Sequence, residues 1–430
     1  MAKIAKKNIF RLTLHPDFQV YNMENSLYNI FRLSNGLKCV HLRNNGNVSY
    51  CGVAINAGSR DDDSDKHGLA HFVEHTIFKG TKHRSSWHIS NRMERIGGEL
   101  NAYTSKEETV IYTVAPTGYS ERAIELLSDL IGNSKFPHHE LEKERIVVID
   151  EINSYLDSPF DSVYDKFEDL IYHNSSMGHN ILGTPDSVMN LNGNDCRNFI
   201  DKFYTPDNMV VYCVDSSPSS KIERLIEKHM GHFHFSKAES IRETPSIVEQ
   251  FDKTICNNNH QAHTLMGIRV FGKHDFRRFP LFLLNNYLGG PCMNSRLNQE
   301  LRDRRGYVYT VDSTIALMSN CGLFQVYFGC DPKHIKKCKQ LIRNEIDKLA
   351  NTLMKPRDLE LAKRQYIGQL NVSSDNRESQ AMNMGKSLLY YNEIHDINWT
   401  TQQIREVTAE QIRATAELLC PENCSTLTLM

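Results

Sequence analysis

The chain contains two successive copies of one structural pattern, and this duplication limits the folds open to it. The strand, turn and helix pattern at 53–75 (VAINAGSRDD through HGLAHFVEH) recurs roughly 210 residues later at 266–286 (MGIRVFGKHDFRRFPLFLLNN). The segment at 113–131 (TVAPTGYSERAIELLSDLI) recurs in the same way at 327–346 (YFGCDPKHIKKCKQLIRNEI). A period of this length indicates two homologous domains and not a solenoid of short repeats.

A polar stretch at 235–250 (FSKAESIRETPSIVEQ) separates the two copies. It contains a proline and no sustained hydrophobic period, which is typical of a linker. We therefore predict an N-terminal domain over 1–234 and a homologous C-terminal domain over 251–430. Each is close to the ~200 residues that one hydrophobic core supports comfortably.

Hydrophobic periodicity predicts a similar order of strands and helices in both copies. The first copy is expected to have strands at 36–43, 49–57, 99–105, 108–115 and 208–215. Its helices are expected in the HGLAHFVEH segment and at 85–96, 119–133, 138–155, 160–173, 184–204 and 219–230. The second copy is expected to have strands at 262–271, 307–317 and 322–330, and helices at 276–288, 293–304, 333–350, 355–374, 378–391 and 403–417.

The bulk composition argues against several classes of partner. Lys and Arg number 50 against 52 Asp and Glu, so no basic surface for nucleic acid or anionic lipid is indicated. No apolar run reaches the length of a membrane span, and the N-terminal stretch has no apolar core of a secretory signal. Eleven cysteines without a C-x-x-C pair are typical of reduced thiols. We therefore expect a cytoplasmic globular protein with no nucleic-acid or membrane partner.

One segment, HGLAHFVEHTIFKG at 67–80, contains a His-x-x-Glu-His sequence formed by His71, Glu74 and His75. On a helix these positions fall on one face, so two imidazoles and a carboxylate point the same way. Two neutral imidazoles at this spacing can hold one Zn²⁺ and leave the Glu free to act on a water. The polar turn SRDDDSD before it offers carboxylates that cap the helix. The alternative is a helix surface that is merely rich in His and Glu.

A zinc site that acts on a substrate usually has three protein ligands, so a third is needed. The predicted helix LEKERIVVIDEINS places Glu144, Val147, Val148 and Glu151 on one face. A carboxylate between buried valines is costly unless a cation compensates its charge, and a zinc ion would do so. Glu151 is therefore a candidate ligand. The alternative is that Glu144 and Glu151 flank a solvated edge of this face.

Two weaker metal candidates lie elsewhere in the chain. The sequence HMGHFH brings together His229, His232 and His234, and the C-terminal end carries Cys420 and Cys424. We interpret the histidines as a helix end and turn before the linker, and the cysteines as core thiols. A second metal at either place is the alternative.

At this point the residues resemble the pitrilysin/insulinase family of zinc metallopeptidases, the inverzincins. A Glu follows the second motif His by 76 positions, and the segments GLAHFVEHTIFKGT and GGELNAYTSKEETVIYTV are similar to the N-terminal signature of that family. The segment SRLNQELRDRRGYVYTV is similar to the C-terminal signature. The match is closest to short bacterial members and processing-peptidase subunits. It implies an α+β fold of two homologous domains, each a mainly antiparallel sheet packed with helices, forming half of a clamshell.

The resemblance also implies a role for each matching position. The implied ligands of one Zn²⁺ per chain are His71, His75 and Glu151. The implied general base is Glu74, and the supporting acidic residue is Glu144. The implied contacts to the substrate at the scissile bond are Arg302 and Tyr309. The implied substrate-binding edge strand comprises Asn101, Ala102, Tyr103 and Thr104.

The resemblance implies a zinc-dependent endopeptidase that cleaves extended, unfolded or short polypeptides. The larger members place the zinc and the Arg–Tyr pair on opposite halves of a chamber, so a two-domain chain is expected to form a homodimer. One feature departs from the family: the glycine-rich loop of certain subunits appears only as LGGPCMNSR. This chain is therefore not expected to be a dedicated presequence-recognition partner. The alternatives are a catalytically silent scaffold and a subunit that needs a different partner chain.

Overall fold

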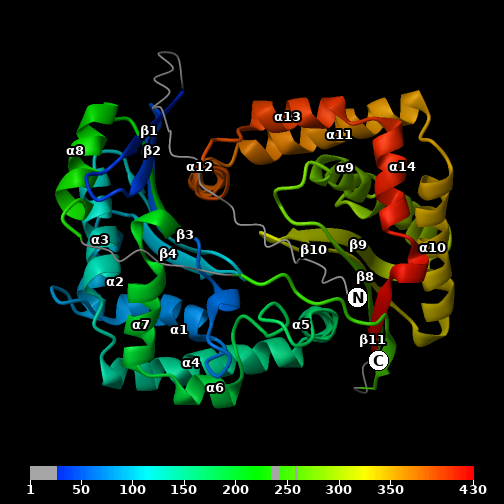
Figure 1. Ribbon diagram of the computed structural model, residues 1–430, viewed down its shortest axis with the longest axis horizontal. Coiled ribbons are helices and arrows are strands. Elements are labelled where there is room, and N and C mark those ends of the chain that lie inside the picture. The colour runs from blue at the N-terminus through cyan, green and yellow to red at the C-terminus, as the bar shows by residue number, and fades with distance from the viewer. Residues whose placement is uncertain (1–26, 234–241, 257–259) are drawn as a thin grey trace, which may run out of the picture.

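The computed structural model describes residues 27–233, 242–256 and 260–430, which form two units, each built on one sheet (Figure 1). The strands of the first sheet are β1 (Tyr28–Arg32), β2 (Lys38–Arg43), β3 (Val48–Ile55), β4 (Glu99–Thr104), β5 (Thr109–Pro116) and β6 (Met209–Asp215). Their order is β1-β2-β6-β3-β5-β4, and only the β2–β6 pair is parallel. The hydrophobic run of β6 is buried along its whole length, as its place inside the sheet requires. β4 forms one edge of the sheet.

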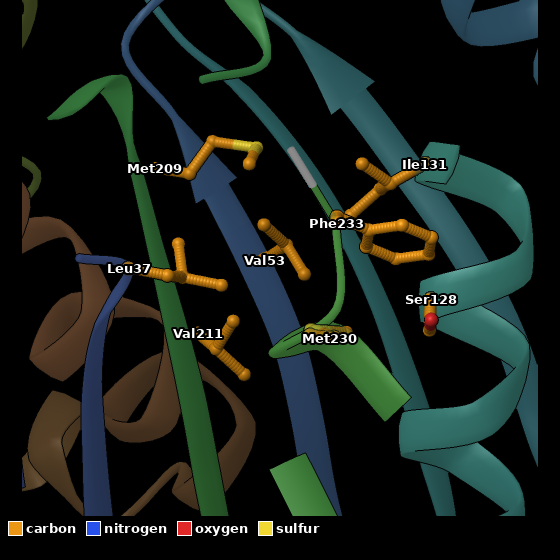
Figure 2. Close-up of a pocket in the computed structure, with 8 residues that line it drawn as sticks. All are labelled: Leu37, Val53, Ser128, Ile131, Met209, Val211, Met230 and Phe233. Carbon is orange, nitrogen blue, oxygen red and sulfur yellow. The ribbon is translucent and has the colours of Figure 1, made fainter. Parts of the chain in front are cut away.

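The helices of the first unit gather against one face of this sheet. They are α1 (Leu69–Thr76), α2 (Ser86–Glu94), α3 (Ser120–Asn133), α4 (His138–Asp157), α6 (Pro185–Asn190), α7 (Gly193–Phe203) and α8 (Ser219–Met230). Their apolar faces and the sheet form one core. Figure 2 shows the small cavity of about 10 Å³ in this core, lined by apolar side chains such as Val53, Met230 and Phe233. A space of this size holds at most about one water, and apolar walls offer it no partners. This space in the core is therefore too small for a ligand.

The second unit repeats this plan with a smaller sheet. Its strands are β7 (Asp252–Ile255), β8 (Ala262–Val270), β9 (Val308–Leu317), β10 (Gly322–Cys330) and β11 (Ser425–Leu429). Their order is β7-β11-β8-β10-β9, with only β7 and β11 parallel. The covering helices are α9 (Arg278–Gly289), α10 (Ile335–Asn351), α11 (Pro356–Ser374), α13 (Ile397–Glu406) and α14 (Ala409–Leu418). β9 forms one edge of this sheet, in the place that β4 has in the first.

Each sheet is covered on its second face by a helix from the other unit. α12 (Arg377–Tyr391) lies between the two units and packs on β3 and β6, where Met384 and Leu388 join Val210 in an apolar cluster (Figure 1). The approach is close, since a Cβ at Gly385 would overlap the Tyr212 ring. Because burying such apolar clusters is the main favourable term in folding, the helix exchange couples the two units.

The reciprocal helix is α5 (Pro159–Ile171), which comes from the first unit and packs on β8 and β11 of the second sheet. Val163 and Phe167 share an apolar cluster with Leu265 and Leu427. Gly267 on β8 makes room for this contact, since a Cβ there would lie 2.7 Å from the Phe167 ring. The two exchanged helices therefore give the molecule an approximate internal symmetry.

Buried charges also join the two units, at the turn between β4 and β5. Glu107 is only 1% exposed and pairs with Arg60 at 2.6 Å and with Lys273 of the second unit at 3.3 Å. Arg242, between the units, pairs with Asp61 at 2.7 Å and with Glu107 at 3.7 Å. Since removing Glu107 would leave Arg60 and Lys273 buried without a described carboxylate beside them, this network holds the turn after β4 against the second unit.

The α+β prediction is confirmed, with two mainly antiparallel sheets packed with helices. Three predicted helices differ in detail. The segment 184–204 forms two helices, and the segment 403–417 spans the end of α13 and most of α14, because Asn192 and Thr408 start new helices with capping boxes. The segment 293–304 contains a π-helical turn, η4 (Asn298–Asp303), instead of a regular α-helix.

Three strands, β1, β7 and β11, were not predicted from periodicity. They have only 4 or 5 residues each, and the pattern of alternate burial that marks a strand is weak in them. The predicted linker at 235–250 lies partly outside the described residues, and its described part, from 242, has no helix or strand. The domain boundaries drawn on either side of it stay predictions. No helix in the described ranges combines the length and the apolar character needed to cross a membrane.

Candidate metal centre

The motif helix α1 starts at a glycine and is held by a buried carboxylate. Gly68 has φ of 90°, a left-handed conformation that favours glycine, and a Cβ there would lie 2.5 Å from the carbonyl oxygen of Leu182. Asp62, from the acidic turn, accepts the backbone N–H groups of Gly68 and Ala70 at 2.8 and 2.9 Å. These bonds satisfy two donors that the first turn of a helix leaves free, and they fix the start of the motif.

Three potential metal ligands meet where α1 packs on α4. The Nε2 atoms of His71 and His75 lie 3.8 and 3.4 Å from Oε2 of Glu151. Potential ligand atoms of the three residues all lie within 4.8 Å of one another. Among the described residues, His71, His75 and Glu151 form the one group of three or more His, Cys, Asp or Glu side chains that is close enough to share one ion. Residues that are 76 positions apart in the sequence therefore converge on one point.

A second carboxylate on α4 contacts the far side of the His75 ring. Oε1 of Glu144 lies 3.1 Å from Nδ1 of His75, which leaves Nε2 of that ring directed toward Glu151. The other oxygen of Glu144 pairs with Nζ of Lys79 at 2.7 Å. A carboxylate on the second nitrogen of a metal-binding histidine sets its tautomer and orientation. Sequence reasoning had matched Glu144 to a supporting role but had not identified Lys79, although it lies one helical turn after His75.

The two histidines are placed in different electrostatic surroundings. Burial and the neighbouring His75 lower the pKa of His71 to about 3, so its imidazole is neutral at physiological pH. Burial by itself would lower the pKa of His75, but its bond to Glu144 and the nearby Glu74 and Glu151 raise it. The pKa of Glu144 is lowered because the partners His75 and Lys79 outweigh its burial. A cluster with this surplus of carboxylates favours a cation.

Glu74 lies between this cluster and the edge strand β4. Burial raises the pKa of Glu74, and the polar groups of Thr104 at the end of β4 partly oppose the shift. Leu100 and Ala102 of β4 pack toward the core that contains α1, while Tyr103 packs on the opposite, α12 face. The edge strand predicted to bind substrate thus ends beside the residue predicted to act as general base.

The predicted face of α4 is wrong in one respect. Val147 is 50% exposed, whereas Val148 is fully buried together with Leu141 and Ile152. The side of α4 that carries Leu141, Val148 and Ile152 therefore packs against the core. Val147 lies next to this side, on the exposed surface of the helix. Glu151 shares this exposed surface and is half-buried, which suits a carboxylate that must be reached by a water or a substrate.

Arg302 and Tyr309 lie in the other unit, on η4 and on the edge strand β9. Tyr309 is 77% exposed, and the guanidinium of Arg302 lies 6.0 Å from the centre of its ring. The elements that carry them pack on β10, α9 and α10, within the second unit. The structure thus places these two side chains close to each other, on elements separate from those that carry the His–His–Glu cluster.

The weaker metal candidates have other surroundings. His229 lies 3.7 Å from Glu121, and the ring of His232 packs on Phe233, while His234 lies outside the described residues. The thiol of Cys424 is buried beside the carbonyl oxygens of Leu419 and Cys420. These contacts explain the described side chains as parts of a helix end and of the core.

The fold and the cluster together define a class of protein: a two-domain α+β chain with a His–His–Glu group beside an edge strand that pairs with one neighbour among the described strands, as in metal-dependent peptidases. Two family models match it in succession. The model described as insulinase (peptidase family M16) matches residues 39–185, and the model described as peptidase M16 inactive domain matches residues 190–366.

Similar proteins extend this match over most of the chain. An uncharacterized zinc protease of Bacillus subtilis, YmxG, is 31% identical over 396 residues, which cover 91% of this chain and 96% of that protein. An uncharacterized zinc protease of Mycobacterium leprae is 31% identical over 372 residues, covering 86% of this chain and 83% of that protein. The chain therefore belongs to the insulinase family of peptidases, M16.

Solved structures show the same fold. The crystal structure of a protease from Helicobacter pylori has a TM-score of 0.86 at 22% identity and covers 94% of this chain and 99% of that chain. A structure from Pseudomonas fluorescens, described as a peptidase M16 inactive domain, has a TM-score of 0.87 at 18% identity, with 94% and 97% covered. At these identities the likeness concerns the two-unit architecture.

Proposed function

We propose that this chain is a zinc-dependent endopeptidase whose metal is held by His71, His75 and Glu151. The observation that carries the proposal is the convergence of three ligand atoms at the contact of α1 with α4. A tetrahedral zinc ion with bonds of about 2.1 Å has ligand atoms roughly 3.4 Å apart. The separations of 3.8 and 3.4 Å from Glu151 to the two histidines fit this arrangement closely.

The chemistry of the donor set also fits zinc. Two imidazole nitrogens and one carboxylate oxygen are typical ligands of catalytic zinc, which keeps a fourth position open. His71 supports the fit, since its low pKa leaves the nitrogen unprotonated. When bound, zinc supplies Lewis acidity toward a water molecule and a peptide carbonyl. The relatives named zinc proteases agree with this choice of metal.

The chain's own residues then move the proton. Glu74 is half-buried close to the cluster, and its raised pKa brings the carboxyl nearer to the operating pH, where a general base works best. It takes the proton of the attacking water and delivers it to the leaving amine. Glu144 holds His75 in the tautomer whose Nε2 is free, and Lys79 keeps Glu144 ionised.

The substrate is proposed to add as a strand along the outer edge of β4, which no strand of the described residues occupies. Main-chain hydrogen bonds to Asn101, Ala102, Tyr103 and Thr104 would orient it with little dependence on its sequence. Side chains of an added strand alternate between the two faces, so every second one points toward α1. This mode requires an extended chain and selects unfolded or short polypeptides.

Arg302 and Tyr309 are proposed to act on the substrate of a second copy. They belong to the second unit, and the exposed phenol of Tyr309 is available for contact across a subunit interface. In a homodimer, the β9 edge of one protomer would face the β4 edge of its partner, and Tyr309 would donate to the oxyanion of the tetrahedral intermediate.

The proposal is tested by peptide hydrolysis with the purified protein. A quenched fluorescent peptide should be cleaved, cleavage should stop on chelation, and added zinc should restore it. Glu74→Gln should retain zinc, and its rate of peptide hydrolysis should fall by at least about 100-fold, because an amide cannot act as a base. Asp150→Asn, on the exposed side of α4, is the matched control and should keep the rate. A zinc-loaded protein that cleaves no peptide from a diverse library would contradict the proposal.

A further inference from the structure

A large cavity lies away from the metal centre, between the turn after β4 and the helices of the second unit. It has a volume of about 850 Å³, within the range of small-molecule sites. Its walls come from the β4–β5 turn, the first half of α9, the end of α11, one side of α12 along its length, and the start of α13. The described residues that line it include none of the side chains of the metal centre. This cavity therefore needs an explanation separate from that of the metal centre.

One wall of this cavity is a stack of aromatic rings. His395 lies on Trp399 with ring centres 3.7 Å apart and planes 6° from parallel, and Tyr391 stacks on His395 at 4.4 Å. Phe279 meets the edge of Trp399 at 5.4 Å. Such a surface is rigid and apolar, and it favours a flat or aliphatic group that can leave water.

A buried arginine that forms no ion pair with any described carboxylate lies beside this wall. Arg278 is 5% exposed, and its guanidinium lies 5.1 Å from the centre of the Tyr391 ring and 5.9 Å from that of Trp399. One of its Nη atoms donates to the carbonyl oxygen of Lys273 at 2.6 Å. Among the described residues, no carboxylate lies within 4.0 Å of its guanidinium. A charge held inside a protein is usually paired, so this arginine points to an anion that comes from outside.

The other charges that line the cavity already have partners. Glu107 pairs with Lys273, and Glu108 pairs with Lys386 at 2.8 Å. Asp396 accepts the backbone N–H of Trp399 at the start of α13. Among the described charged residues that line this cavity, Arg278 is therefore the one whose guanidinium has no carboxylate to bind.

We propose that the cavity binds a carboxylate joined to an apolar body, with the carboxylate on Arg278 and the body on the Tyr391–His395–Trp399 stack. A guanidinium and a carboxylate form a paired hydrogen-bond geometry that a neutral amide or alcohol does not reproduce. The same chemistry is offered by a free small carboxylic acid and by the C-terminal residue of a peptide. The site is distinct from the proposed peptidase centre and does not depend on it.

The chain offers a direct optical test, since it has only two tryptophans. Trp87, exposed on α2, is replaced in Trp87→Phe, so that Trp399 is the only tryptophan left. Its emission is recorded while 3-phenylpropionate or N-acetylglycyl-phenylalanine is added, each beside its own amide. We expect a saturable change with an acid and at least about tenfold weaker binding of the matching amide, because the charge-assisted bond is lost. Whether the small acid or the peptide acid responds identifies the source of the carboxylate.

Arg278→Met, which keeps about the same side-chain length, should weaken binding of the acid by at least about tenfold. The matched control is Arg277→Met, since Arg277 is exposed, pairs with Asp275 and does not line the cavity. It should leave binding within about twofold, which is the scale of effects expected from a distant surface charge. If Arg278→Met does not fold, Ser374→Phe, which fills the cavity from α11, should abolish the response in its place.

The proposal also predicts a rise in melting temperature with the acid and none with its amide, because a ligand that binds only the folded state stabilises it. Equal responses to acid and amide would overturn the proposal. So would the absence of a saturable change with both acids, or acid binding that survives both Arg278→Met and Ser374→Phe.

Discussion

Glu107 of the first unit accepts hydrogen bonds from both the backbone N–H and the hydroxyl of Ser319 in the second unit, at 2.8 and 2.7 Å. The same carboxylate pairs with Arg60 and Lys273. Burial by itself would raise the pKa of Glu107, but Arg242, Lys273, Ser319 and Arg60 lower it to about 2. This residue therefore helps to attach the turn after β4 to the second unit, and it contributes to the pH dependence of stability.

The first prediction concerns this carboxylate. Because the folded-state pKa is depressed, its contribution to stability is fully present above the unfolded value of about 4.5 and is lost as the pH falls toward 2. Glu107→Gln leaves buried cations unpaired and should lower the free energy of unfolding by about 3–5 kcal/mol at pH 7. Urea denaturation should show this difference at pH 7 and a smaller one at pH 3.

The control for this measurement is an exposed acid. Glu121→Gln removes a surface pair with Lys228, and the effect should stay under about 1 kcal/mol. If the difference between Glu107→Gln and the unchanged chain does not shrink between pH 7 and pH 3, the carboxylate is not the source of the stability assigned to it.

The second prediction concerns metal content. The purified protein should hold close to one zinc per chain, and His71→Ala or Glu151→Ala should lose most of it, since each removes one of three donors. Metal analysis after dialysis measures this directly. His229→Ala serves as the control, because that residue contacts Glu121 and lies outside the cluster. Full zinc retention in both ligand variants would show that the ligands have been assigned wrongly.

The third prediction separates Glu144 from the ligands. It contacts the Nδ1 of His75 and not the position assigned to the ion, so Glu144→Gln should bind the same number of zinc ions but about 10–100-fold more weakly. Competition with a chelator of known affinity measures the change. Lys79→Met, which removes only the partner of Glu144, should have a smaller effect in the same direction. An unchanged zinc affinity in Glu144→Gln would remove the proposed orienting role.

The fourth prediction concerns the composite site. Glu74→Gln and Tyr309→Phe chains, each nearly inactive alone, are mixed under conditions that allow subunit exchange. If Tyr309 acts on the partner's substrate, some mixed dimers hold one intact site and activity returns. The yield should approach about one quarter of the wild-type rate in a random mixture, since half of the dimers are mixed and each has one complete site. Confirmed exchange without recovered activity would place the whole site within one chain.

The local chemistry of the centre could be predicted because it depends on spacing along one helix. The i, i+3 and i+4 positions of His71, Glu74 and His75 share a face in any α-helix. The buried face of α4 could not be predicted in the same way, because a valine is apolar whether it is buried or exposed. The structure shows that Val147 is exposed and Val148 is buried, which follows from the packing of α4 on its neighbours.

The sequence by itself determined the duplicated organisation, the α+β class and the residue types available for a metal, because periodicity and motif spacing are local properties. Only the tertiary structure decided which distant groups meet. Glu151 lies 3.4 Å from His75, Lys79 pairs with Glu144, and α12 and α5 exchange between units. It also decided that Arg278 is buried with no described carboxylate in ion-pair distance, while Glu107 pairs with several cations. Such pairings depend on how whole helices and sheets pack against one another. They therefore cannot be predicted from the sequence of any single segment.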